Sequence, residues 1–157
     1  MEPTVCEALL TRDHTKEGSE PLSSEDVSNY LVVLVRLASL DGFDVTEKGF
    51  IHRTAACLGL HPDLARNAHR FAANPSVTTE ELVARIRDRG LRLCLLRDAY
   101  RLAAADGSVS PAEIGELANI AKALRIDHGA AASVKAMALQ EARLQREFAQ
   151  MVKSARA

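Results

Sequence analysis

Apolar residues recur along the chain at the spacing of an amphipathic helix. The clearest run follows Ser23, a residue type that caps helix N-termini, and has apolar side chains at i, i+3, i+4, i+7, i+8 and i+11: Val27, Tyr30, Leu31, Leu34, Val35 and Ala38. Most residues between these positions are apolar too, which is typical of a helix buried on all sides. The pattern therefore predicts a central helix that ends before Asp41-Gly42.

The same spacing, with capping residues and breakers at the ends, predicts six further helices. They cover residues 46–58, 62–71, 78–86, 91–105, 111–124 and 128–155. We expect Thr46 to cap the first of these and Gly90 to separate the third from the fourth. Ser110, Pro111 and Glu113 form the strongest helix start in the chain. The fold class predicted is an all-α, single-domain bundle of about seven helices with a long C-terminal helix.

Composition and charge add a second division of the chain. Residues 1–30 hold seven acidic and two basic residues, although the whole chain has a net charge of only −1. We expect residues 1–22 to be an acidic flexible leader and residues 23–157 to be the helical domain, whose end can project. No basic excess indicates a nucleic-acid partner, and no apolar run is long enough for membrane insertion. Three cysteines without metal or redox spacing, and no secretory signal, favour a cytoplasmic location.

Two parts of the chain resemble each other. Asp41-Gly42 matches Asp106-Gly107, Val45-Thr46 matches Val109-Ser110, and Leu58 matches Leu124. Repeats of one helical unit usually pack as a pseudo-symmetric pair, so the two Asp-Gly turns are expected at equivalent places in the fold. Whether the turns lie close together is left open by the sequence.

The second copy resembles the TerB-like domain of bacterial tellurite-resistance proteins. The residues that carry the resemblance are 103–113, Ala-Ala-Ala-Asp-Gly-Ser-Val-Ser-Pro-Ala-Glu, with a looser copy at 40–47. The resemblance covers about residues 25–145. It implies a single all-α bundle without established catalytic activity, found in bacterial stress-resistance clusters beside membrane and calcium-binding partners, and related to domains that precede J-domains in membrane-anchored co-chaperones.

The resemblance also implies candidate metal ligands in the acidic turns, at Asp41, Asp106 and Glu113. The first copy departs from the family pattern because Asp44 is inserted, the position of Glu113 falls on Gly49, and Glu47 is displaced. From the residues themselves, Asp41, Asp44, Asp106 and Glu113 are candidate ligands for Ca²⁺ or Mg²⁺ if the turns converge, since these cations prefer several carboxylate oxygens. The alternative is structural, because Asp-Gly forms turns and acidic residues stabilise helix starts.

Two other groups of residues are candidate contact sites. Arg85, Arg89 and Arg92 could face an anionic partner, or form a solvated basic face or a docking surface for the leader. In the last helix, an apolar stripe interrupted by Glu141 continues beyond the expected bundle through Leu144, Phe148, Met151 and Val152. These four residues either pack on the bundle or contact a protein partner, including a second copy in a homodimer.

The sequence favours a non-catalytic protein-interaction module, resembling TerB, in a cytoplasmic stress-response or envelope-associated assembly of a bacterium. Its protein partner could belong to a membrane-associated complex, and no cofactor is predicted unless the acidic turns hold Ca²⁺ or Mg²⁺. A divalent-cation sensor built from the paired acidic turns is the alternative. A small hydrolase has only scattered acidic residues in its support, and it requires a pocket that holds a carboxylate of perturbed pKa.

Overall fold

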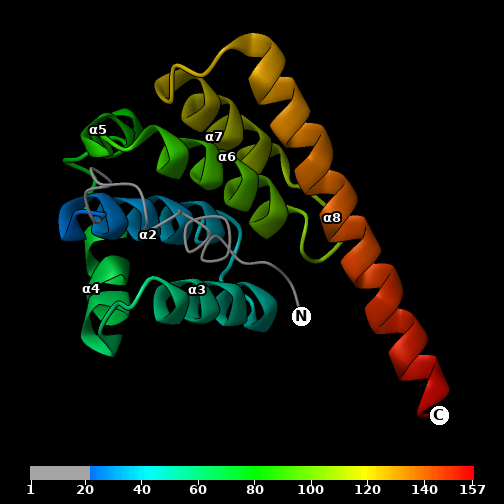
Figure 1. Ribbon diagram of the computed structural model, residues 1–157. Helices are drawn as coiled ribbons and strands as arrows, with labels where there is room; N and C mark the ends of the chain where they lie inside the picture. The colour runs from blue at the N-terminus through cyan, green and yellow to red at the C-terminus, as the bar shows by residue number, and fades with distance from the viewer. Residues whose placement is uncertain (1–21) are drawn as a thin grey trace, which may run out of the picture.

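The computed structural model describes residues 22–157, and the predicted leader at 1–22 therefore falls almost wholly outside the described residues. The helices in the described part are α2 (Ser24–Ala38), α3 (Val45–Cys57), α4 (Pro62–Ala72), α5 (Thr79–Arg85), α6 (Arg89–Ala103), α7 (Pro111–Ala123) and α8 (His128–Ala155). No strand occurs between residues 22 and 157. The predicted all-α bundle with a long C-terminal helix is confirmed (Figure 1).

Helix α2 lies at the centre of the core, as its sequence predicts. It packs on α3, α4, α5 and α6, so each of its sides meets another helix. Eleven of its 15 residues are buried, including the entire run from Tyr30 to Val35. The chain around it is held in one hydrophobic cluster to which α3, α5, α6 and α7 also contribute.

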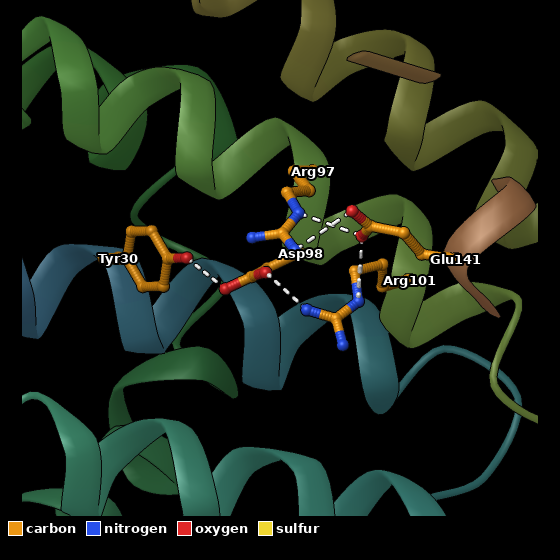
Figure 2. Close-up of polar contacts among 5 residues, drawn as sticks. All are labelled: Tyr30, Arg97, Asp98, Arg101 and Glu141. Carbon is orange, nitrogen blue, oxygen red and sulfur yellow. Dashed lines mark hydrogen bonds and ion pairs between the residues drawn. The ribbon is translucent and has the colours of Figure 1, made fainter. Parts of the chain in front are cut away.

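A polar contact crosses this core between α2 and α6. The Tyr30 hydroxyl donates a 2.5 Å hydrogen bond to Oδ2 of Asp98, and both residues are fully buried (Figure 2). Nη1 of Arg101, one turn along α6, lies 3.7 Å from Oδ1 of Asp98. The Asp98 carboxylate is therefore balanced inside the bundle by a phenol and a guanidinium.

The same network reaches α8 through Glu141. Arg97 donates from Nε and Nη2 to the two carboxylate oxygens of Glu141, at 3.0 and 3.1 Å, and Nε of Arg101 lies 3.6 Å from Oε2 (Figure 2). Glu141, which interrupts the apolar stripe in the sequence, is thus the residue that connects α8 to α6 by hydrogen bonds and ion pairs. This bidentate pairing is the geometry that suits a guanidinium and a carboxylate.

The internal repeat extends over three helices in each half. Helices α2 and α6 have 15 residues each, and α3 and α7 have 13 each. In both halves the first helix packs against the second and the third, as α2 does with α3 and α4, and α6 does with α7 and α8. The repeat predicted from the turns therefore includes the helices α4 and α8 as counterparts, with α5 between the halves.

Two predicted helix starts are wrong. The N-cap of α3 is Asp44, not Thr46, since the Asp44 carboxylate accepts a hydrogen bond from the Glu47 amide at 2.7 Å. Helix α6 starts at Arg89, with Asp88 as its N-cap, so Gly90 lies inside the helix instead of separating it from α5. In both places an aspartate carboxylate accepts a hydrogen bond from an amide of the first turn, and this sets where the helix begins.

Helix α8 packs on the bundle over its first half, where Val134 of the stripe packs against the core and Glu141 pairs with Arg97. Its fully buried residues are Ala138 and Ala142, whereas Met137, Leu144, Phe148 and Met151 of the stripe are exposed. Small side chains let α8 approach α6 closely over its first half. The second half extends past the rest of the bundle (Figure 1).

Candidate functional site

The candidate site lies where the two Asp-Gly turns meet. Each turn joins the first and second helix of one half of the repeat, with Gly42 between α2 and α3 and Gly107 between α6 and α7. Their φ angles are 109° and 98°, a region that favours glycine. This conformation reverses the chain within a few residues and places the preceding aspartates, Asp41 and Asp106, beside the start of the next helix.

Each of these next helices starts with a capping box. The N-cap side chain of Asp44 accepts from the Glu47 amide, while the Glu47 carboxylate accepts from the Asp44 amide at 2.9 Å. Ser110 and Glu113 repeat the arrangement at the start of α7, with the Ser110 amide 2.8 Å from the Glu113 carboxylate. The capping boxes turn both glutamates back toward the turns that precede them.

The two turns converge, which the sequence left open. Asp41, Glu47 and Glu113 each place a carboxylate oxygen so that all three atoms lie within 4.8 Å of one another. They border a pocket of about 230 Å³ that is also lined by Asp44 and Asp106. Carboxylates from both halves of the repeat therefore share one small space.

The electrostatics of the pocket are those of crowded negative charge. Glu47 and Glu113 are only 7% and 3% exposed, and the described residues that line the pocket include no Lys, Arg or His. Burial, together with the nearby charges of Asp44, Glu113 and Asp41, raises the pKa of Glu47 to about 7, although the hydrogen bond from the Asp44 amide opposes this shift. At neutral pH, this site favours a proton or another cation.

The four candidate ligands from the sequence all line this pocket, and two of them, Asp41 and Glu113, belong to the close group. Glu47 is the third member of that group. The expected alignment of Gly49 with Glu113 is wrong, because Glu47 occupies the same third position of its capping box as Glu113 does. The sequence signal for Glu47 is the capping-box spacing, because Asp44 and Glu47 are three residues apart, as Ser110 and Glu113 are.

The arginine candidates are spread over two helices. Arg85 ends α5 and Arg89 begins α6, with a non-helical segment between them, and both side chains are exposed. Arg92 lies one turn into α6, where its Nε donates to the Ile86 carbonyl at 2.7 Å. The three residues therefore do not lie on one continuous helix.

The apolar candidates of α8 are exposed on the projecting part of the helix. Leu144, Phe148 and Met151 are 52%, 68% and 67% exposed, and Val152 is 37% exposed. The last side chain of α8 with a hydrogen bond to the bundle is Arg146, which donates to the Ala104 carbonyl. Within the described chain, every residue of α8 after Arg146 is exposed.

Protein-family models, curated proteins and solved structures were compared with the chain, and none matches it. Among the helices that the structure describes, none combines the length and the apolar character needed to cross a bilayer.

Proposed function

We propose that this chain is a non-catalytic binding protein whose acidic pocket holds a divalent cation of the Ca²⁺ or Mg²⁺ type. The observation that carries the proposal is the meeting of the Asp41, Glu47 and Glu113 carboxylates within 4.8 Å. Residues of both halves of the repeat take part, so the pocket is a property of the whole bundle and not of one helix start.

Charge balance supports a cation. A capping box accounts for the position of one glutamate at the start of one helix, but not for two such glutamates buried beside each other. Buried carboxylates are normally paired with a basic side chain, and no described residue in the lining supplies one. A divalent cation would neutralise Glu47 and Glu113 together.

Distances support the same ligand. Oxygen atoms bind Ca²⁺ at about 2.3–2.6 Å, so two ligands on opposite sides of the ion lie about 4.6–5.2 Å apart. The carboxylate oxygens of Asp41, Glu47 and Glu113 meet this limit. Each glutamate uses Oε2 for the N-cap amide, which leaves Oε1 for an ion, while Asp44 and Asp106 border the same space.

A hydrolase would use the same pocket differently. Glu47 is a carboxylate of raised pKa in a pocket, which is what that hypothesis requires. However, catalytic carboxyl pairs of glycosidases lie about 5–9.5 Å apart so that a sugar and a water fit between them. The carboxylate oxygens of Asp41, Glu47 and Glu113 lie closer together than such a pair, and the pocket has a volume of only about 230 Å³. Both features suit an ion better than a substrate.

Calorimetric titration of the full chain with Ca²⁺ and with Mg²⁺ tests the proposal. We expect saturable heat and a rise in melting temperature for the wild-type protein, and loss of both in Glu47→Gln and Glu113→Gln. Glutamine keeps the capping boxes, because its side-chain oxygen still accepts from the N-cap amide. Absence of heat and of a thermal shift at millimolar cation would overturn the proposal.

The chain contains a matched control for these variants. Thr78 and Glu81 form a third capping box at the start of α5, and this glutamate is exposed and borders none of the acidic pocket. Glu81→Gln should therefore leave cation binding unchanged. Equal losses in Glu81→Gln and Glu47→Gln would show that the heat comes from general surface charge.

A second function, binding of a protein partner through α8, is favoured by the exposed side chains of Leu144, Phe148 and Met151. From Arg143 onward the helix carries three basic residues and one acidic residue, and Arg156 follows it, so the complementary partner surface is apolar with acidic flanks. A photo-crosslinking residue at position 148 should capture one discrete protein. The same residue at exposed Gln150, off the stripe, should not, and equal capture from both positions would exclude the stripe as the contact.

Membership of the TerB-like family, and with it a cytoplasmic role in a bacterial stress or envelope-associated assembly, is part of this proposal. The paired helix, Asp-Gly turn and helix units support it. The genes that neighbour this one would test it, since the resemblance implies a stress-resistance cluster.

A further inference from the structure

A second pocket of the bundle is surrounded by basic side chains. It has a volume of about 390 Å³ and lies between α5, the start of α6 and the end of α7. Arg92, Lys122 and Arg125 line it with Ala84 and Ala123, and Glu80 is the one acidic residue among the described residues of the lining. The balance of charge at this pocket is positive, in contrast to the acidic pocket.

Arg125 has a backbone conformation that is unfavourable for arginine. Its φ angle is 50°, and among the described residues no other non-glycine has a positive φ. It directly follows the C-cap of α7, Leu124, just as Gly59 follows the C-cap of α3, Leu58, with a φ of 67°. The first half of the repeat thus has glycine, which adopts this conformation without cost, where the second half has arginine.

The other two cations are also specific to the second half. Superposing the helix starts of α2 and α6 pairs Arg92 with Val27, and superposing those of α3 and α7 pairs Lys122 with Ala56. The fold forms the same turn and the same helices in the first half without any of these charges. The basic side chains are therefore not needed to build the elements that carry them.

The three side chains are available to a ligand. Arg92 is oriented by the hydrogen bond from Nε to the Ile86 carbonyl, which leaves its terminal nitrogens to donate elsewhere. The side chains of Lys122 and Arg125 form no hydrogen bond or ion pair with another described residue. Two guanidinium groups and an ammonium at one pocket match the oxygens of a phosphate group.

We propose that this pocket binds a small soluble molecule that carries a phosphate monoester. The volume lies at the lower end of the range for small-ligand pockets. None of the described residues that line it is aromatic, so they offer no stacking surface for a nucleobase. Lys122 and Arg125 bind the phosphate from the end of α7 and the residues after it, and Arg92 binds it from the start of α6. The proposal is independent of the acidic pocket.

Titration of the ¹⁵N-labelled protein by NMR, at constant ionic strength, tests the assignment with inorganic phosphate and with glycerol 3-phosphate as probes. Both should shift the amide signals around Arg92 and residues 122–126, with the monoester binding more tightly. Arg125→Gly should bind the monoester roughly tenfold more weakly and should also melt at a higher temperature, because glycine relieves the backbone. That combination separates loss of a ligand contact from loss of the fold.

Arg85→Ala and Arg89→Ala are the matched controls, since both arginines are exposed nearby and neither lines the pocket. They should bind glycerol 3-phosphate as the wild type does. The proposal is overturned if these controls lose as much affinity as Arg125→Gly, or if Arg125→Gly binds normally. It is also overturned if vesicles containing phosphatidic acid bind the protein while the soluble monoester does not.

Discussion

The Tyr30 hydroxyl in α2 donates a 2.5 Å hydrogen bond to the Asp98 carboxylate in α6, and neither side chain is exposed to solvent. Burial raises the pKa of Asp98 to about 6, against the opposing effects of Tyr30 and Arg101. The contact joins the first helices of the two repeat halves in the middle of the core. The hydrogen bond therefore contributes to the stability of the packing between the two halves.

Replacing the phenol removes this contact with little change in volume. Tyr30→Phe leaves a buried carboxylate oxygen without its donor, so we expect the free energy of unfolding to fall by about 1–3 kcal/mol in chemical denaturation. Tyr100→Phe is the control, because Tyr100 is partly buried and its hydroxyl bonds to no described residue. Equal losses in the free energy of unfolding for the two substitutions would show that the Tyr30 hydrogen bond does not stabilise the fold.

Removing Glu141 should loosen α8. Arg97 and Arg101 both face this carboxylate, and Glu141→Ala leaves two half-buried or buried guanidinium groups without it. Because Glu141 itself is partly exposed, we expect a loss of about 1–2 kcal/mol rather than the larger cost of a fully buried pair. Hydrogen exchange should accelerate in α8 before it does in α2. Glu147→Ala, which breaks only the exposed pair with Arg143, should leave exchange unchanged.

The pH dependence of stability reports on the acidic pocket. The pKa of Glu47 is about 7 in the folded chain and 4.5 ordinarily, so the folded state binds more protons between these values. Stability without added cation should therefore fall as pH rises through this window, by roughly 1–3 kcal/mol. Asp98 acts in the same direction and is still half protonated at pH 6, so the comparison is between the wild type and Glu47→Gln over pH 6 to 8. In Glu47→Gln the fall in stability should be clearly smaller over this range, and an unchanged slope would contradict the assignment.

Cation binding should release protons for the same reason. With a pKa of about 7, Glu47 is about half protonated at neutral pH, and a bound cation requires its carboxylate form. Titrations with Ca²⁺ at pH 7 in buffers of different ionisation enthalpy should show release of about half a proton. Affinity should rise from pH 6 to pH 8. In the control Glu113→Asp, which retains the charge, cation binding should still release protons. A wild-type affinity that does not change with pH would exclude Glu47 as a ligand.

The fold was predictable from local patterns, and the site only in part. The spacing from Val27 to Ala38 identified the central helix, and the Asp-Gly turns identified the repeat, because both signals depend on neighbouring residues. The convergence of Asp41 with Glu113 depends on how α2, α3, α6 and α7 pack, which no local pattern contains. The sequence shows Glu47 beside the first turn but leaves it out of the four candidate ligands, because the copies are aligned on Thr46 and Ser110 whereas capping depends on Asp44.

Helix α8 shows a second limit of such patterns. Its apolar stripe left open whether the large side chains pack on the bundle or meet a partner, and in the structure the buried residues are Ala138 and Ala142. Hydrophobicity alone does not distinguish a face that meets the rest of the chain from one that remains available. Glu141 interrupts the stripe in the sequence and carries the contact in the structure, because its partners, Arg97 and Arg101, come from another helix.

The division of the acidic pocket between the two repeat halves has a mechanical consequence. Asp41 and Glu47 belong to one half and Glu113 to the other, and α4, α5 and α6 lie between Glu47 and Glu113 in the chain. An ion held by all three would act as a clamp, adding its binding free energy to the cohesion of the halves. A chain nicked in the segment between α4 and α5 should then stay assembled when loaded and separate more readily when the ion is chelated.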